Sequence, residues 1–104
     1  MLHMTQHRID AIQNRIQIIK QKLTEVGVMR PGSLTMQTRS TADKAFEYWQ
    51  LSYTHKMKSR TDYVRKDLVK QTQAQVNEFK KFKKLMDEWT DLAIEQAKLI
   101  VKIG

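Results

Sequence analysis

The stretch FEYWQLSYTHKMKSRTDYV, residues 46–64, predicts the centre of the fold. Its first half alternates, so that Trp49, Leu51 and Tyr53 point to one side of an extended chain and the residues between them point to the other. After a short polar turn the alternation resumes. Aromatic and threonine-rich alternation on both sides of a turn predicts an antiparallel β-hairpin, and residues 34–39 are expected to supply a short third strand.

The residues before this stretch predict a helix with a narrow apolar stripe. Apolar side chains recur at alternating spacings of three and four residues, as in a coiled coil. They are Leu2, Ile9, Ile12, Ile16, Ile19, Leu23 and Val26. We expect this helix over residues 3–26, with Gly27 as a left-handed cap at its end and a turn at Pro31-Gly32.

The residues after the hairpin predict a long C-terminal helix over residues 66–103, because no Gly or Pro interrupts them. One apolar stripe at spacings of three and four is broken only by Gln96; it consists of Phe79, Phe82, Met86, Trp89, Ala93, Ile100 and Ile103. A second row runs beside it at seven-residue spacing and consists of Leu85, Leu92 and Leu99. The apolar face is therefore wider than a coiled-coil stripe needs.

This width predicts two contacts for the long helix. We expect the first helix to pack antiparallel on it, with Ile9, Ile12, Ile16, Ile19 and Leu23 against Phe82, Met86, Trp89 and Ala93. The row of Leu85, Leu92 and Leu99 then stays uncovered, and uncovered apolar rows usually mark an interface. We expect a homodimer through these leucines, the commonest symmetric arrangement. In the alternative, the N-terminal residues and the hairpin cover the row.

These elements predict a mainly helical α+β protein: a coiled-coil-like helix, a small antiparallel sheet within residues 27–65 and a long amphipathic helix. At 104 residues, a single domain over 1–104 is expected. No apolar run approaches the roughly 18 residues of a membrane span. The start of the chain, MLHMTQHRIDAI, also turns polar too early for a signal peptide. We therefore expect a cytoplasmic protein that has no membrane partner.

The order of motifs resembles a small prokaryotic family of unknown function. In that family a helix leads into a Pro-Gly-Ser-Leu motif, followed by an aromatic strand, a basic return strand and a long helix. The matching positions are Pro31, Gly32, Ser33 and Leu34, then Leu51, Ser52 and Tyr53, then Lys58, Arg60, Tyr63, Val64, Lys66 and Leu68. Typical members carry a Cys-rich knuckle between the motifs, where this chain has TRSTADKA. The resemblance thus implies the fold, whereas metal binding is lost or replaced.

Enzyme chemistry is not indicated. The chain has no cysteine, which excludes disulfides, thiol catalysis and cysteine-based zinc sites, and its 3 glycines form no phosphate-binding loop. His3 and His7 share a helix face, but that spacing alone is a weak metal signal. The acidic residues of the long helix are expected to pair with nearby lysines. We expect a non-catalytic protein without a metal or cofactor.

The charge predicts a negatively charged partner. The chain carries 19 Lys and Arg against 11 Asp and Glu, a net charge of +8, and the excess is concentrated between residues 28 and 66. We expect nucleic acid, DNA or RNA, to be bound through its phosphates. The candidate phosphate contacts are Lys56, Lys58, Arg60, Arg65 and Lys66, extended by Lys80 and Lys83.

Trp49 and Tyr53 are expected to stack on bases in this hypothesis, although both rings could instead pack on a helix. A different function uses the same charges. In that alternative the chain is a protein-interaction module, an adaptor or a mobile-element-encoded inhibitor, whose basic end docks on an acidic or nucleic-acid-binding protein.

Overall fold

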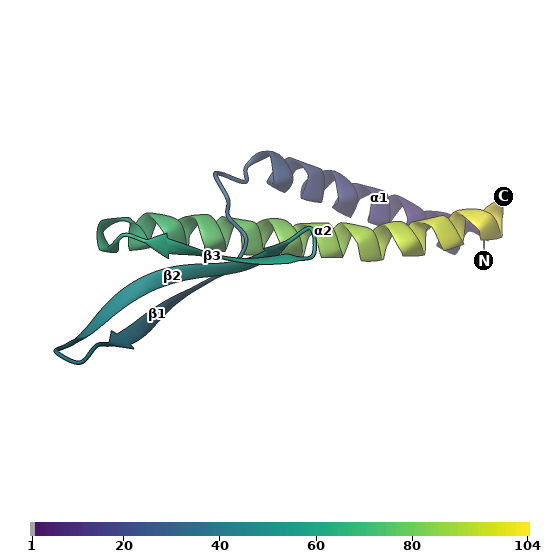
Figure 1. Ribbon diagram of the computed structural model, residues 1–104. Coiled ribbons are helices and arrows are strands. Elements are labelled where there is room, and N and C mark those ends of the chain that lie inside the picture. Colours follow the sequence, from purple (N-terminus) through teal and green to yellow (C-terminus); the bar gives the residue numbers. More distant parts are fainter. Residues whose placement is uncertain (1) are drawn as a thin grey trace. The chain divides into compact units, whose positions relative to one another are not determined.

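A computed structural model describes the backbone of residues 2–104 and the side chains of residues 3–104 (Figure 1). The elements are α1 (Leu2–Thr24), β1 (Ser33–Ser40), β2 (Ala45–His55), β3 (Lys58–Val64), the 3-10 turn η1 (Lys66–Leu68) and α2 (Val69–Ile103). The expected α+β fold is confirmed, including the third strand, which is β1. The Leu2 side chain, the first position of the predicted stripe, lies outside the described residues.

The chain divides into two compact units. The sheet unit comprises residues 27–80, and the helix unit comprises the chain up to Val26 together with residues 81–104. Helix α2 contributes its first part to the sheet unit and the remainder to the helix unit. Whether the two units unfold together as one cooperative domain stays a prediction.

The sheet is antiparallel in the order β1-β2-β3, with the long strand β2 in the centre. Leu51 of β2 pairs with Leu34 of β1, and Trp49 pairs with Val64 of β3. Since directly paired residues share a face of a sheet, the register defines two faces. One of them, here called the packed face, carries Leu34, Trp49, Leu51 and Val64.

The packed face lies against the first part of α2. Leu51 has 0% of its surface exposed, and it forms the core of the sheet unit with Val64 and with Val76 of α2. Leu34, Trp49, Tyr53 and Val69 pack around this core. The period-two alternation predicted for residues 46–64 therefore gives the correct strand faces.

The loop between α1 and β1 is held by two backbone donors. The Gly27 N–H donates to a carboxylate oxygen of Glu78 at 2.9 Å, and the Arg30 N–H donates to the Gln75 carbonyl at 3.1 Å. The expected left-handed cap at Gly27 is wrong, because Gly32 is the glycine whose φ is positive, at 127°. At Gly32 a Cβ atom would lie 2.7 Å from the Ser52 carbonyl oxygen, so close approach of the chain to β2 requires glycine there.

In the helix unit, α1 and α2 run antiparallel. Arg8 pairs with Glu95 and Arg15 with Glu88, so a position later in α1 meets a position earlier in α2. Each guanidinium makes two hydrogen bonds to its carboxylate, at 2.6 and 2.9 Å for Arg8 and at 2.5 and 3.0 Å for Arg15. The α1 side of the contact is the predicted one, since the buried residues are Ile9, Ile12, Ile16 and Ile19.

The α2 side of this contact differs from the prediction. Leu85 is buried, at 7% exposure, and Leu92 and Leu99 are half-buried, so this row faces α1 instead of staying uncovered. Met86, expected against α1, is 37% exposed. Glu88, which pairs with Arg15, follows Leu85 by one helical turn, so the ion pairs and the leucine row lie on the same side of α2. The expected homodimer contact through the leucine row is therefore corrected.

Candidate nucleic-acid interface on the sheet

The face of the sheet opposite the packed face carries no acidic residue. The register places Arg39 beside Phe46, Gln37 beside Tyr48 and Gln50 beside Tyr63 on this open face. The complete set is Ser33, Thr35, Gln37, Arg39, Phe46, Tyr48, Gln50, Ser52, Thr54, Ser59, Thr61 and Tyr63. None of these side chains is buried. The open face thus combines hydroxyl, amide and aromatic groups with one positive charge.

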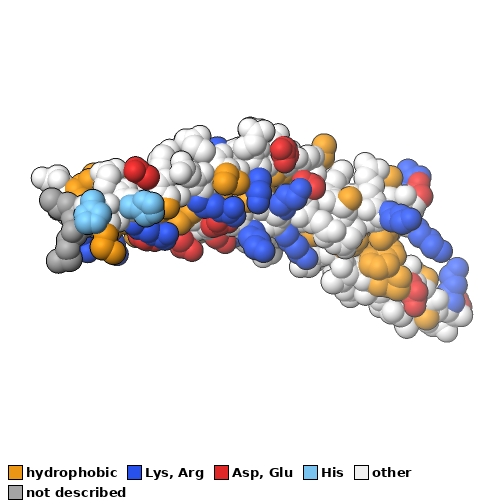
Figure 2. Space-filling view, turned by 180° about the vertical axis from the view of Figure 1, so that it is seen from behind, with side chains coloured by type: hydrophobic (Ala, Val, Ile, Leu, Met, Phe, Trp, Pro, Cys, Tyr) orange, Lys and Arg blue, Asp and Glu red, His pale blue; other side chains and the backbone are white. Residues whose placement is uncertain are grey.

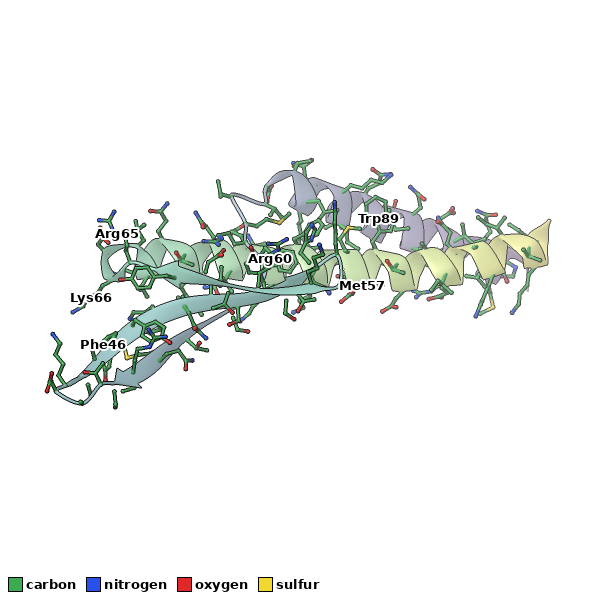
Figure 3. All side chains as sticks on the ribbon, viewed as in Figure 1. Phe46, Met57, Arg60, Arg65, Lys66 and Trp89 are labelled. Atoms are coloured by element: carbon green, nitrogen blue, oxygen red, sulfur yellow. The ribbon has the colours of Figure 1, made fainter. Side chains whose placement is uncertain are left out.

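Three rings gather at one end of the open face, here called the aromatic cluster. Tyr63 is 70% exposed and Phe46 is 40% exposed. The Phe46 and Tyr48 ring centroids lie 6.4 Å apart with the ring planes tilted by 46°. The Arg39 guanidinium lies over the Tyr48 ring, 5.9 Å from its centroid, in a cation–π arrangement. Figure 3 shows Phe46 on the hairpin of β1 and β2.

A hollow of about 140 Å³ connects the aromatic cluster to a lysine. Tyr48 and Tyr63 line it from the open face, and Lys66 of η1 lines it beside them. Its remaining walls are Met36, Glu47, Trp49 and Val64. Glu47 belongs to the packed face but lines the same hollow, so one carboxylate also lies near the two tyrosines. The hollow places one ammonium group next to the exposed aromatic surface.

The turn between β2 and β3 forms a basic end of the sheet. Lys56, Lys58 and Arg60 are exposed, and among the described residues none of the three has an ion-pair partner. Lys56 and Met57 both adopt left-handed backbone conformations, with φ of 52° and 64°. Met57 is 99% exposed at the tip of this turn (Figure 3). Two left-handed residues suit a tight hairpin, but the conformation is strained for residues other than glycine.

The other predicted basic residues are distributed differently. Arg65 makes an exposed ion pair with Asp67 at 2.9 Å, so its charge is partly neutralised. Lys66 makes no ion pair with any residue that the structure describes. Lys80 belongs to the sheet unit, and Lys83 belongs to the helix unit. At the end of the β1–β2 hairpin, Figure 2 shows apolar side chains beside both Lys or Arg and Asp or Glu side chains.

The expectation that Trp49 and Tyr53 are free to stack on bases is wrong. Both lie on the packed face, half-buried against the core around Leu51. The exposed rings are those of Phe46 and Tyr63, which sequence reasoning did not select. For Phe46 the signal was present in the alternation, because a strand whose centre is the buried Leu51 turns its even-numbered residues to the other face. For Tyr63 it is the neighbouring Val64 of β3 that is buried, which turns Tyr63 outward.

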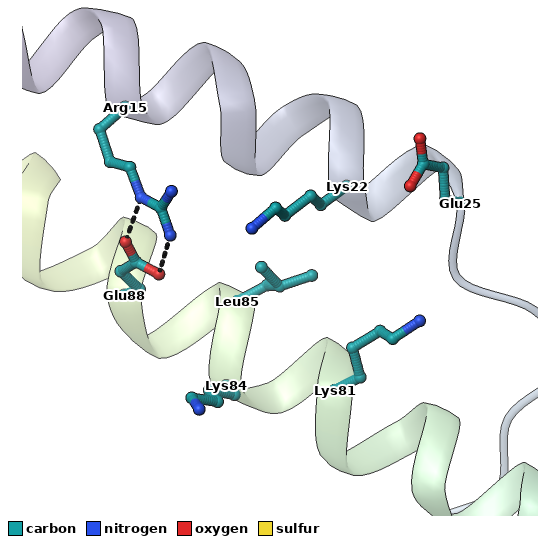
Figure 4. A pocket seen from close by; sticks show the side chains of 7 residues that line it. All are labelled: Arg15, Lys22, Glu25, Lys81, Lys84, Leu85 and Glu88. Atoms are coloured by element: carbon teal, nitrogen blue, oxygen red, sulfur yellow. Dashed lines mark hydrogen bonds and ion pairs between the residues drawn. The ribbon is translucent and has the colours of Figure 1, made fainter.

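The helix unit contains a second hollow, of about 400 Å³, between α1 and α2 (Figure 4). Its lining residues are Arg15, Lys22, Glu25, Lys81, Lys84, Leu85 and Glu88. The pKa of Glu88 is lowered chiefly by the hydrogen bonds from Arg15, with smaller contributions from the charges of Lys22 and Lys84. The positive charges around this hollow therefore stabilise a carboxylate of the chain itself.

Two further features of the described residues bear on chemistry. No three His, Cys, Asp or Glu side chains within this part of the chain gather to hold a metal ion. None of the helices described combines the length and apolar character that crossing a membrane requires.

Comparison of the chain with family models, curated proteins and solved structures finds no match. The resemblance to the small prokaryotic family accordingly stays a prediction.

Proposed function

We propose that the protein binds single-stranded nucleic acid on the open face of its sheet, without catalysing a reaction. The observation that carries this proposal is a strand surface with exposed aromatic rings and no acidic side chain. Unpaired bases stack on exposed rings, whereas the bases of a duplex are already stacked on one another. Tyr63 and Phe46 are the rings best placed to receive bases.

The phosphate contacts in this proposal come from the two ends of the sheet. Arg39 and Lys66 lie beside the aromatic cluster, and Lys56, Lys58 and Arg60 lie at the turn end. Along β3, the distance from Lys58 to Tyr63 is about 17 Å at roughly 3.4 Å per residue. Lys58 and Arg60 pair with His55 and Tyr53 and so belong to the packed face, whereas Tyr63 belongs to the open face. A short single strand lying along β3, an edge strand of the sheet, would place its bases on the rings, and Lys58 and Arg60 would reach its backbone around this edge. Because phosphate contacts dominate, we expect this binding to have little sequence preference. We propose that it takes place in the cytoplasm.

A second candidate function, a protein-interaction module, is supported by a different observation. The outer side of α2 in the helix unit carries an apolar groove lined by residues from Met86 to Ala97. Such a surface suits a protein partner better than a phosphate backbone. The sheet and the groove belong to different units, so the two functions do not compete for the same residues.

The test is an anisotropy titration with labelled single-stranded and duplex oligonucleotides of DNA and of RNA. At about 50 and 200 mM salt we expect affinity to fall steeply as salt rises, because phosphate binding releases counterions. Single strands are expected to bind more tightly than duplexes of the same sequence.

Variants in which a basic side chain is neutralised identify the residues that contact the phosphates. Lys58→Gln and Arg60→Gln should each weaken binding on all sequences and lower the salt slope by about 1. Lys102→Gln, an exposed lysine of the helix unit, is the matched control and should bind like the unaltered chain. Absence of binding to every oligonucleotide at the lower salt concentration would overturn the proposal.

A further inference from the structure

Helix α2 carries a second apolar row beside the one that meets α1. This outer row consists of Met86, Thr90, Ala93, Ala97 and Ile100. Together with Trp89 and Ile94, four of these residues line a shallow groove of about 420 Å³. Around it Ile94 is 52% exposed, Ile100 is 50% exposed and Val101 is 79% exposed. In the single chain this much apolar surface remains in water, which is unfavourable.

The outer row has a shape suited to another helix. Its centre is formed by the small side chains of Thr90, Ala93 and Ala97, and larger apolar side chains, Met86 and Ile100, lie toward its two ends. Helix axes approach to about 8–10 Å, and the smaller distances require small residues at the point of contact. Size alone does not identify which helix lies there.

The charged residues beside the outer row indicate which helix lies there. Asp87 and Lys98 are eleven residues apart, which is about three turns at 3.6 residues per turn, so both lie on the same flank of the row. Neither has an ion-pair partner among the described residues. The opposite flank carries Trp89 and Gln96 and lies beside α1, since the Lys20 ammonium lies 5.4 Å from the Trp89 ring centroid and Gln96 donates a hydrogen bond to Gln13.

We propose that two copies of this chain associate through the outer row, with their α2 helices antiparallel around a two-fold axis beside Ala93. Met86 and Ile100 are each seven residues from Ala93, so Met86 of one copy meets Ile100 of the other. In an antiparallel pair the same flank of both helices lies on the same side. Asp87, six residues before Ala93, therefore faces Lys98 of the second copy, five residues after it, and the contact occurs twice.

A parallel pair would not bring Asp87 and Lys98 together, because it sets their flank of one helix against the other helix's flank of Trp89 and Gln96, where α1 lies. With α1 packed on each α2, the antiparallel pair is an arrangement of four helices, which buries more apolar surface than two helices do. The proposal is independent of nucleic-acid binding, since all its residues belong to the helix unit.

The absence of cysteine in the natural chain allows a direct test by cross-linking. Ala93→Cys lies beside the axis and should form a disulfide-linked dimer under mild oxidation. Met86→Cys alone should stay unlinked, and the double variant Met86→Cys with Ile100→Cys should link. Linkage of Met86→Cys alone would instead indicate a parallel pair and contradict the proposal. Asp91→Cys, on the exposed side of α2, is the control and should stay unlinked.

Light scattering on the unaltered chain at micromolar concentration should give twice the 12.3 kDa chain mass. Asp87→Lys should weaken dimerisation severalfold, and so should Lys98→Asp, because each sets like charges against one another. The double variant should recover the original affinity, since both contacts are restored with reversed sign. A monomer mass throughout, or charge variants that dimerise as well as the unaltered chain, would overturn the proposal and leave the row to a different protein.

Discussion

The guanidinium of Arg39 on β1 lies over the ring of Tyr48 on β2, 5.9 Å from the ring centroid. This contact joins a positive charge to the aromatic cluster on the open face of the sheet. Arg39 also pairs directly with Phe46 across the two strands, so the charged side chain is a neighbour of two residues of the aromatic cluster. A phosphate bound at Arg39 would have its base within reach of exposed aromatic surface.

Tyr63 is expected to contribute to binding through its ring and not through its hydroxyl group. Tyr63→Ala should weaken single-strand binding by about 1–3 kcal/mol, the range for one stacked base. Tyr63→Phe keeps the ring plane and should bind nearly as well as the unaltered chain. Since Tyr63 is 70% exposed, thermal unfolding should change little in either variant. Equal loss of affinity in both variants would argue against stacking.

Gly32 is expected to be the glycine that the fold requires. Gly32→Ala should lower the free energy of unfolding by about 1–3 kcal/mol, since its φ is left-handed and the new Cβ would meet the Ser52 carbonyl. Gly27→Ala is the matched control, because a Cβ there lies 3.9 Å from its nearest neighbour, in ordinary contact. Denaturant unfolding of both variants measures the difference. A Gly27 variant as unstable as the Gly32 variant would contradict this account of the loop.

Two isoleucines of α1 provide a matched test of the helix contact. Ile16 is 3% exposed and Ile18 is 47% exposed. Ile16→Ala should lower the free energy of unfolding by about 2–5 kcal/mol through lost burial and a cavity. Ile18→Ala removes the same atoms from a partly solvated position and should cost much less. Similar melting temperatures for the two variants would reject the assignment of the buried stripe.

The ion pairs of the helix unit predict a loss of stability in acid. Hydrogen bonds from Arg15 and Arg8 hold the pKa of Glu88 and of Glu95, respectively, below the ordinary glutamate value. Their stabilising effect is present above the unfolded pKa of about 4.3 and is lost as the pH falls through the lower folded-state values. The variant carrying both Glu88→Gln and Glu95→Gln should therefore lose less stability between neutral and acidic pH than the unaltered chain.

The matched control for this pH series is Asp91→Asn, on the exposed side of α2. Asp91 makes no ion pair with any described residue, so its variant should follow the acid profile of the unaltered chain. Circular dichroism at the helix minimum measures both profiles. An unchanged acid profile in the double Gln variant would show that the two ion pairs do not set the pH dependence.

The sequence predicts α1 and the strand faces well because each has a single apolar row. Spacings of three and four place Ile9 to Ile19 on one side of α1, and period two places Leu51 on the packed face. Helix α2 is harder to predict, since it has two adjacent apolar rows and periodicity does not rank them. The leucine row is on the side where Glu88 and Glu95 pair with Arg15 and Arg8, and those partners are remote in sequence, so the pairing cannot be read from the periodicity of α2.

The candidate site is only partly predictable for a similar reason. Lys56, Lys58 and Arg60 follow from their place in a short basic hairpin, and the structure leaves them exposed. For Trp49 and Tyr53 the sequence leaves stacking on bases and packing on a helix both open, and the structure shows that they pack against the core around Leu51. The absence of acidic residues from the open face becomes visible only when the register of three strands is known.

Amide chemical shifts recorded during titration with a short single-stranded oligonucleotide test the central claim most directly. We predict that shifts concentrate on the open face and its two basic ends, including Arg39, Tyr48, Tyr63 and Lys58. The helix unit, represented by Ile12 and Lys102, should change little. Shifts confined to α1 and to the part of α2 beyond Lys80, with the strands unaffected, would contradict the assignment of the sheet as the nucleic-acid surface.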